Sequence, residues 1–266
     1  FMAPVWWPAV ERRSSARPVE EDRRVGSSTR PMRVLHLVGR SHRRGAEQVA
    51  LELATELDRL GHDDRMAAVT AGHRGETLTE LPALVPAAGQ SVGSLLRATV
   101  ALRRDVRRAP VDAVLAHGAA AALVAGLGLP RRGPALVWQR ILGLAARSTT
   151  GALGAVWRLA VRRIDGVVAL TRSMEGETRA VGFRGPVWVI PNARRVERFA
   201  DLDRDRAGRE LRHELGLDPG THLVGLVGYL VEQKAPTKAI EVLAAVRGAG
   251  VDAHLVVAGD GPLRPA

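Results

Sequence analysis

Residues 223–262 read LVGLVGYLVEQKAPTKAIEVLAAVRGAGVDAHLVVAGDGP, and this stretch decides the fold of the chain. The apolar run 223–230 is long enough for one buried strand, and 253–258 forms a second such run. The helical pattern between them places four apolar residues on one face, namely Ala239, Ile240, Leu243 and Ala244. Strand, helix and strand at this spacing predict a right-handed parallel crossover.

Ligands of such sheets bind at the carboxyl ends of the strands. Lys234 lies in the loop after the first strand, and the turn Gly259-Asp260-Gly261 ends the second. Both are therefore expected at the ligand-binding edge of this sheet.

The same alternation of strands and helices fills residues 32–192 and predicts a doubly wound α/β domain there. The first strand is followed by a loop with Gly39 and Gly45, whose free backbone N–H groups at a helix N-terminus suit an anion. This loop is not GxGxxG, so the dinucleotide fingerprint is absent. The predicted strands are 33–38, 65–70, 81–87, 111–116, 135–138, 166–170 and 187–190, and the main helices are 46–60, 94–108, 119–127 and 153–163.

Four segments make up the expected domain organisation of the 266 residues. Residues 1–31, rich in Pro, Ser, Arg and Glu, are expected to be a disordered or non-native leader. Residues 32–192 form the first domain and 193–219 a charged connector. Residues 220–266 begin a second domain, and we expect it to be truncated because two strands are too few for such a domain.

Composition narrows the functional classes. The chain has no cysteine, which excludes disulfides and thiolate metal sites and leaves a cytoplasmic location unopposed. The net charge of +11 comes almost wholly from arginine, which is a habit of GC-rich genomes but also favours anionic partners. Dispersed arginines and scarce aromatic residues argue against nucleic acid. No apolar run approaches the roughly 20 residues that a membrane-spanning helix needs.

Four pieces of sequence, in this order and spacing, resemble the family 4 glycosyltransferases of GT-B fold. They are RVLHLVGRSHRRGAEQVALELATEL from Arg33, VDAVLAHG ending at Gly118, VWVIPNARRVERF with Asn192, Arg198 and Phe199, and GYLVEQKAPTKAIEVL…VVAGDGP. The resemblance implies two Rossmann-like domains, the acceptor-side domain first and the donor domain second. It also implies transfer of a sugar from a nucleotide-diphosphate donor to a saccharide, lipid or small-molecule acceptor, with retention of configuration, no cofactor and no metal.

The resemblance assigns donor-phosphate binding to Lys234, together with Gly228 and Tyr229 at the preceding strand end. Tyr229 stands where the family usually has an arginine, so it offers a hydrogen bond but no charge. Ala235 replaces the usual glycine, which we expect to be a mild change. Gly259, Asp260 and Gly261 form the donor-side turn, and Asp260 is alternatively a capping or solvated carboxylate.

In the first domain, Gly39 and Gly45 are expected in the floor of the cleft. Gln139 or Arg140 stands where a histidine often ends a strand of the family, so that active-site histidine is expected to be missing. His117, at the end of another strand, is the catalytic candidate; its alternative is a structural hydrogen bond.

Two other functions stay open beside glycosyl transfer. One is a GT-B-fold sugar-nucleotide epimerase. The other is a non-enzymatic anion-binding or membrane-surface module, because arginines line the helices 94–108 and 153–163. Peripheral contact with the acidic inner face of a membrane is the corresponding location, although these arginines are alternatively solvated outer faces.

Overall fold

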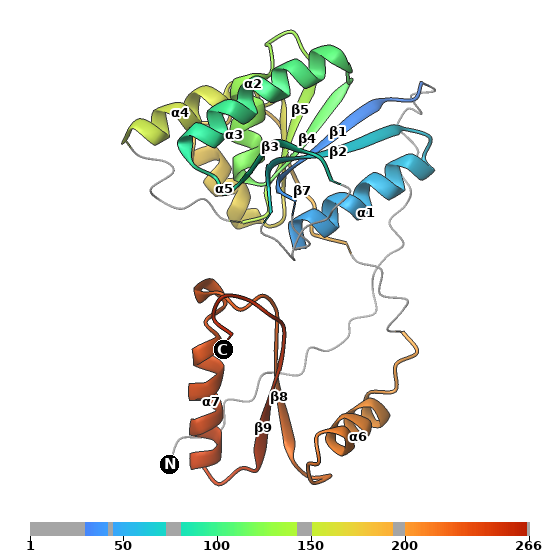
Figure 1. Ribbon diagram of the computed structural model, residues 1–266, viewed down its shortest axis with the longest axis vertical. Helices are drawn as coiled ribbons and strands as arrows, with labels where there is room; N and C mark the ends of the chain where they lie inside the picture. Colours follow the sequence, from blue (N-terminus) through green and yellow to red (C-terminus); the bar gives the residue numbers. More distant parts are fainter. Residues whose placement is uncertain (1–29, 42–44, 73–80, 143–150, 194–199, 265–266) are drawn as a thin grey trace. The chain divides into compact units, whose positions relative to one another are not determined.

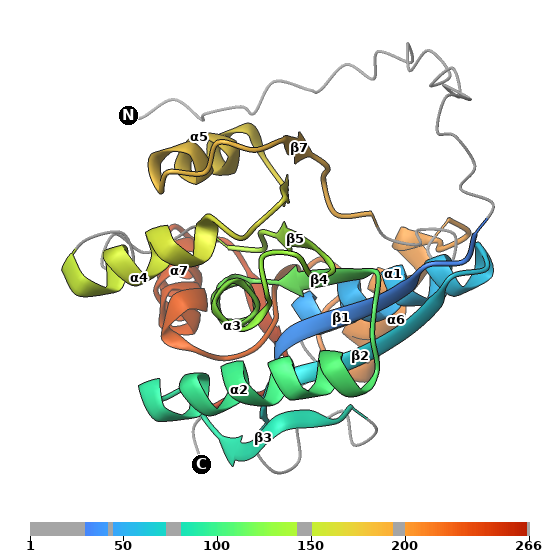
Figure 2. The same ribbon diagram turned by 90° about the horizontal axis from the view of Figure 1, so that it is seen from above.

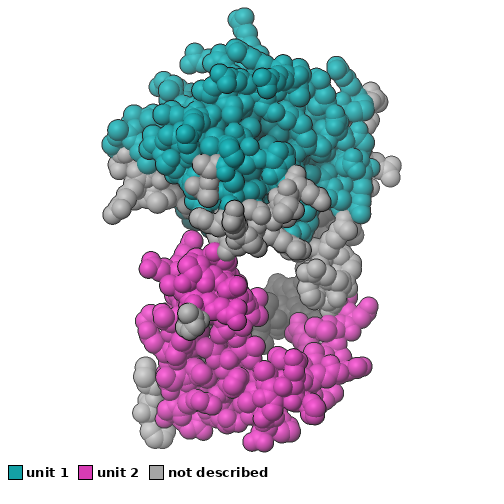
Figure 3. Space-filling view, in the orientation of Figure 1, with its two compact units in different colours: residues 1–192 teal, residues 193–266 magenta. Residues whose placement is uncertain are grey.

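The computed structural model describes residues 30–41, 45–72, 81–142, 151–193 and 200–264. The chain divides into two compact units, residues 1–192 and residues 193–266 (Figure 3). In the described residues no helix is long and apolar enough to cross a membrane.

The described part of unit 1 is built on a sheet of seven parallel strands in the order β3-β2-β1-β4-β5-β6-β7 (Figure 1). Parallel strands buried on both faces are continuous apolar runs, which is why they could be located in the sequence. Their bounds are β1 Arg33–Arg40, β2 Asp63–Ala71, β3 Ala83–Ala88, β4 Ala113–His117, β5 Ala135–Gln139, β6 Gly166–Ala169 and β7 Val187–Val189.

Helices cover both faces of this sheet (Figures 1 and 2). On one face Ala50 of α1 packs against Val38 of β1, whereas Leu35 and Leu37 point into the main core on the other face with residues of α2, α3 and α4. The side chains of Ser91 and Thr171 cap α2 and α5. The bounds are α1 Gly45–Arg59, α2 Val92–Arg108, α3 Ala119–Gly128, α4 Gly151–Val161 and α5 Arg172–Ala180.

The apolar periodicity of residues 46–60 places Leu60 on the buried side of the first helix, and the structure contradicts this. Leu60 is 73% exposed because α1 ends at Arg59 and the chain turns at Gly61, whose φ is +86°. Glu47, in the first turn, is buried instead.

Unit 2 contains the crossover predicted from residues 223–262. In its described residues, β8 (His222–Val227) pairs in parallel with β9 (Ala253–Ala258), and α7 (Pro236–Gly248) connects them. α6 (Arg204–Glu214) buries no residue, in keeping with its charged sequence. Ile240 was predicted on the buried face of α7 but is 60% exposed; Leu243 is partly buried, because α7 packs mainly along β9.

Candidate functional site

The two strand ends of unit 2 lie side by side, as the parallel crossover requires. The turn 228–230 follows β8 and the turn 259–261 follows β9; we call them the strand-end turns. The Gly228 N–H donates to the Ala258 carbonyl at 3.0 Å, and the Leu230 N–H donates to the Asp260 carbonyl at 2.8 Å. These backbone bonds extend the pairing of β8 and β9 beyond both strands.

Glycine is required where the strand-end turns touch. A Cβ on Gly259 would overlap the Gly228 carbonyl oxygen, and a Cβ on Gly261 would overlap the backbone of Leu230. Asp260 also serves this turn, since its Oδ1 accepts from the Gly261 N–H at 2.8 Å. All three residues of the predicted donor-side turn therefore stabilise the contact between the two turns.

Lys234 ends the short 3-10 helix η3 (Glu232–Lys234), directly before α7. It is exposed, and no carboxylate pairs with it in the described part of the chain, whereas Lys238 pairs with Glu241 at 2.7 Å. α7 begins with a proline, and among the described residues no side chain caps it. A free ammonium beside an uncapped helix N-terminus is a suitable arrangement for an anion.

Ala235 is not the mild change that the sequence suggested. Its φ and ψ are 45° and 56°, and among the described residues it is the one non-glycine residue with a positive φ. This left-handed conformation costs an L-residue about 1–2 kcal/mol and is the conformation that glycine adopts freely. The turn that aims Lys234 is therefore strained.

In unit 1, His117 belongs to a buried row of polar side chains that crosses the sheet. His117 Nε2 lies 3.0 Å from His36 Nδ1, and His36 Nε2 lies 3.0 Å from Asp64 Oδ1. The two imidazoles stack with their ring centroids 5.3 Å apart, and both are buried. Gln139 pairs with His117 in the register of β4 and β5 and extends the row.

This row fixes the tautomer of each neutral histidine. Because the Asp64 carboxylate can only accept, His36 donates from Nε2, and its Nδ1 becomes an acceptor. His117 must then donate from Nε2, which leaves its Nδ1 as a bare acceptor; in the described residues that atom is buried and has no hydrogen-bond partner. The hydrogen bond that the sequence left as the alternative for His117 exists, and its catalytic role stays a prediction.

Burial keeps both histidines neutral. It lowers the pKa of His117 to about 3; a proton on His36 would repel a second one on His117 and lowers this pKa further, whereas the neighbouring Gln139 side chain opposes the shift. Burial likewise lowers the pKa of His36, although Asp64 opposes it by its hydrogen bond and its charge. Uptake of a proton by this row is therefore coupled to unfolding.

We expect unit 1 to lose stability as the pH falls below about 6.5, the ordinary value for histidine. From there down to about 3 the unfolded chain binds a proton that the folded His117 refuses, so each pH unit costs about 1.4 kcal/mol. His117→Gln keeps a donor for His36. It should lower the number of protons taken up on unfolding by about one, and with it the slope of the free energy of unfolding against pH. Urea unfolding followed by tryptophan fluorescence over this pH range measures it.

The matched control is His62→Gln, because His62 lies at the turn after α1, is partly exposed, and its Nδ1 accepts from the Met32 N–H at 3.3 Å. An unchanged slope in His117→Gln, or an equal change in the control, would contradict the assignment.

Gln139 and Arg140 lie at the end of β5. They stand in place of the histidine that the family resemblance implied at this position. Gln139 is buried beside His117, whereas the Arg140 guanidinium is fully buried against α5. Its Nη1 donates to Thr178 Oγ1 at 2.9 Å, and its Nη2 pairs with Glu177 Oε2 at 2.6 Å. Arg140 therefore attaches α5 to β5 and presents no free cation at the sheet edge.

The glycine loop begins later than predicted, because β1 continues to Arg40 and so includes Gly39. The Gly39 carbonyl accepts from Gln90 Nε2 at 3.0 Å, and Gly45 is the exposed first residue of α1. Asn192 is exposed, while Arg198 and Phe199 lie outside the described residues.

His36 and Asp64 were not singled out in the sequence. Each lies within an otherwise ordinary strand pattern, and 81 residues separate His36 from His117. The sequence feature that could have pointed to His36 is its position as a histidine within an apolar run. Among the described residues, no group of three or more histidine and acidic side chains is placed to hold a metal ion.

Comparison with models of protein families identifies the family of this chain. The family model described as Glycosyltransferase Family 4 matches residues 43–198, more than half of the chain. The chain belongs to this family. The match covers α1 and the sheet of unit 1 from β2 to β7. A search of curated proteins gives no match.

Solved structures share the fold at low sequence identity. HepE of Anabaena, in complex with UDP and glucose, matches with a TM-score of 0.64 and 19% identity, over 87% of this chain and 62% of its own. The glycosyltransferase WaaG, involved in lipopolysaccharide biosynthesis, matches at 0.55 and 13%, over 85% of this chain and 70% of its own. UDP-GlcNAc 2-epimerase from Neisseria meningitidis matches at 0.55 and 15%, over 88% and 67%.

These matches confirm the predicted GT-B-like α/β fold class. The chain spans 62% of the length of the HepE structure that it matches.

Proposed function

We propose that the protein transfers a sugar from a nucleoside-diphosphate sugar to an acceptor hydroxyl. The observation that carries the proposal is the family match over residues 43–198. The arrangement in unit 2 supports it, because Lys234, which has no carboxylate partner among the described residues, and the N-terminus of α7 come shortly after the turn 228–230. Relatives in this fold have been solved with UDP and with UDP-glucose, which makes a uridine nucleotide the first donor to test.

The proposed chemistry places the diphosphate at the N-terminus of α7. Negative charge develops on the leaving diphosphate as the glycosidic bond to the sugar breaks, and fixed positive groups stabilise that charge. We assign this task to Lys234 and to the Thr237 N–H in the first turn of α7, because Pro236 has no N–H and the Lys238 N–H donates to the Ala235 carbonyl. Gly228 allows close approach, and Tyr229 donates a hydrogen bond. In this assignment the bound nucleotide needs no metal to neutralise it.

The two lysines of the chain give a matched pair of variants for this proposal. Lys234→Gln should weaken the binding of UDP about tenfold, because one charge-assisted contact to a phosphate is lost at an exposed site. Lys238→Gln removes the same charge four residues later, where it pairs with Glu241, and should leave binding unchanged. Isothermal titration of each variant with UDP measures both.

Equal losses in the two variants would show a general effect of charge and would contradict the role of Lys234. Transfer itself is tested with a panel of nucleotide sugars and of saccharide, lipid and small-molecule acceptors. We propose retention of configuration, on the family resemblance alone. The anomeric proton coupling of the product in an NMR spectrum decides this point.

An epimerase is the second candidate, because the Neisseria UDP-GlcNAc 2-epimerase shares the fold. An epimerase changes a sugar nucleotide when no acceptor is present, and the sugar that appears differs in the configuration of one carbon. A transferase needs the acceptor to form its product. Incubation of the protein with each donor, with and without acceptors, separates the two reactions.

A further inference from the structure

The sheet of unit 1 has its switch point between the neighbouring strands β1 and β4. α1, which follows β1, packs on the face that carries Val38, whereas α3, which follows β4, packs on the opposite face with Leu35 and Leu37. The strand order β3-β2-β1-β4-β5-β6-β7 accordingly runs outward in both directions from this pair. In doubly wound sheets, ligands bind at the carboxyl ends of the strands at such a point.

Arg40, the last residue of β1, lies at this point. Its side chain is partly buried, and in the described part of the chain it has neither a carboxylate nor a hydrogen-bond partner. The backbone beside it is fixed, because the Ser41 N–H donates to the Thr70 carbonyl at 3.2 Å and Ser41 Oγ accepts from the Gly72 N–H at 2.9 Å. A charge withdrawn from water without a partner is unfavourable, so Arg40 is suited to an anionic ligand.

Thr70 of β2 adds a hydroxyl beside this arginine. It is the partner of Arg40 in the register of β1 and β2, so both side chains lie on the face that α1 covers. Thr70 is fully buried, and among the described residues its Oγ1 has no hydrogen-bond partner. Buried hydroxyls are nearly always hydrogen-bonded, so this one is available to a ligand at the strand end.

Helix α3 supplies further donors at the end of β4. Its N-cap, Gly118, has a φ of +87°, and among the described residues no side chain caps the helix, so the N–H groups of Ala119 and Ala120 lack an intrahelical partner. Both residues are accessible. His117 pairs with β1 two residues before Arg40, and neighbouring strands lie about 4.8 Å apart, within the reach of an arginine side chain.

Two other buried atoms at this edge are explained without a ligand. His117 Nδ1 and Gln139 Oε1 have no hydrogen-bond partner within the described residues. The two side chains are neighbours on β4 and β5, however, and the amide of Gln139 can turn its NH2 group to His117 Nδ1. The ligand contacts are therefore assigned to β2, β1 and the start of α3 alone.

We propose that Arg40, Thr70 and the N-terminus of α3 bind a phosphate group of the acceptor. The guanidinium neutralises the anion, and the hydroxyl and the α3 N–H groups donate to its remaining oxygens. Donors from three neighbouring strands match the several oxygens of a phosphate monoester better than the two of a carboxylate. The acceptor role rests on the proposed sugar transfer, whereas the binding of phosphate to unit 1 does not.

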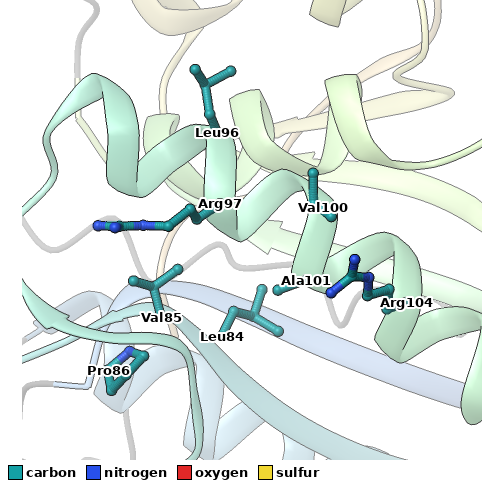
Figure 4. A pocket seen from close by; sticks show the side chains of 8 residues that line it. All are labelled: Leu84, Val85, Pro86, Leu96, Arg97, Val100, Ala101 and Arg104. Atoms are coloured by element: carbon teal, nitrogen blue, oxygen red, sulfur yellow. The ribbon is translucent and has the colours of Figure 1, made fainter.

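The exposed arginines of α2 provide a matched control. A groove of about 620 Å³ between β3 and α2 has aliphatic walls, with Arg97 and Arg104 at its two ends (Figure 4). Arg97 is exposed, and none of the described residues that line this groove has a buried polar atom without a partner. Arg97→Gln therefore removes the same charge as Arg40→Gln, from the same unit, at a place with no such hydroxyl.

Titration of the isotope-labelled whole chain with inorganic phosphate tests the site by NMR. The amide signals of Ala119 and Ala120 should shift and saturate. Arg40→Gln should weaken this binding about tenfold, because one charge-assisted contact is lost, and Arg97→Gln should leave it unchanged. Equal weakening in the two variants would show an effect of net charge and overturn the site, and so would the absence of a saturable shift.

Thr70→Val has a second readout, because it removes the hydroxyl and keeps nearly the same shape. Phosphate binding should weaken about fivefold for the lost hydrogen bond. Without phosphate, the urea midpoint of unit 1, followed by tryptophan fluorescence, should rise, since an unpartnered hydroxyl is no longer buried. A lowered midpoint would show that the hydroxyl stabilises the fold and would contradict its assignment to a ligand.

Parallel titrations identify the class of acceptor. Glucose-6-phosphate and a short-chain phosphatidic acid separate a soluble phosphate from a lipid one, and glucose should not shift the α3 signals. Acetate that binds as tightly as phosphate would overturn the phosphate assignment. Lys234→Gln should keep phosphate binding. Phosphate binding without binding of UDP or sugar transfer contradicts the proposed function alone, whereas UDP binding without these shifts contradicts this site alone.

Discussion

Gly259→Ala is expected to destabilise unit 2 by separating its two strand-end turns. The added Cβ would overlap the Gly228 carbonyl oxygen, and that atom belongs to backbone already bonded to Ala258, so neither turn can move without losing the bonds between them. Overpacking against a fixed backbone costs typically 1–3 kcal/mol and sometimes more. We expect a loss near the upper end of this range, and with it the binding of UDP.

Hydrogen exchange measured by mass spectrometry is the suitable readout, because the sequence of unit 2, residues 193–266, contains no tryptophan. A loss of about 3 kcal/mol corresponds to amides in β8 and β9 that exchange about a hundredfold faster. Tryptophan fluorescence should show an unchanged unit 1. The variant thus separates damage to the strand-end turns from general unfolding.

Gly225→Ala is the matched control for Gly259→Ala. Gly225 lies within β8, has no positive φ, and a Cβ placed there would meet no atom within 4 Å. Alanine should therefore be neutral or slightly stabilising, because it narrows the unfolded ensemble. If both glycines tolerate alanine equally, the contact between the two turns does not constrain unit 2, and the site built on it has to be abandoned.

The sequence predicted the elements of the fold because each is encoded locally. Buried parallel strands are short apolar runs, and helices show a periodic apolar face with glycine at the end, as at Gly61. The predicted strand 223–230 stops at Val227 in the structure, since Gly228 takes a φ of +148° that a strand residue does not adopt. Boundaries depend on such backbone angles, which an apolar pattern does not reveal.

The candidate site was predictable only in part, and the reason lies in register. Lys234 and the turn at Gly259 could be placed at one sheet edge because the carboxyl ends of parallel strands coincide. The contact of His36 with His117 requires the register of β1 against β4, and this depends on packing across the whole sheet. The strain at Ala235 was equally hidden, because its φ is imposed by the junction of two helices.

Arg140→Ala is expected to lower the free energy of unfolding of unit 1 by about 3–4 kcal/mol. A fully buried arginine departs from the rule that charged side chains stay exposed, so its burial could not be predicted from its position in the sequence. In the structure the guanidinium lies 5.4 Å from the Trp138 ring and binds both Thr178 and Glu177 of α5. Alanine removes these bonds and leaves a cavity next to Trp138.

Arg140→Met separates the two contributions to that loss of stability, namely the hydrogen bonds to α5 and the packing against Trp138. Methionine fills much of the same volume and packs against Trp138, and Glu177 is exposed enough to regain water, so the loss should be only about 1–2 kcal/mol. Urea unfolding followed by tryptophan fluorescence compares the variants in unit 1. If methionine costs as much as alanine, the hydrogen bonds to α5 outweigh the packing, and the residue is held in place by its charge. If both are neutral, Arg140 does not attach α5 to the sheet.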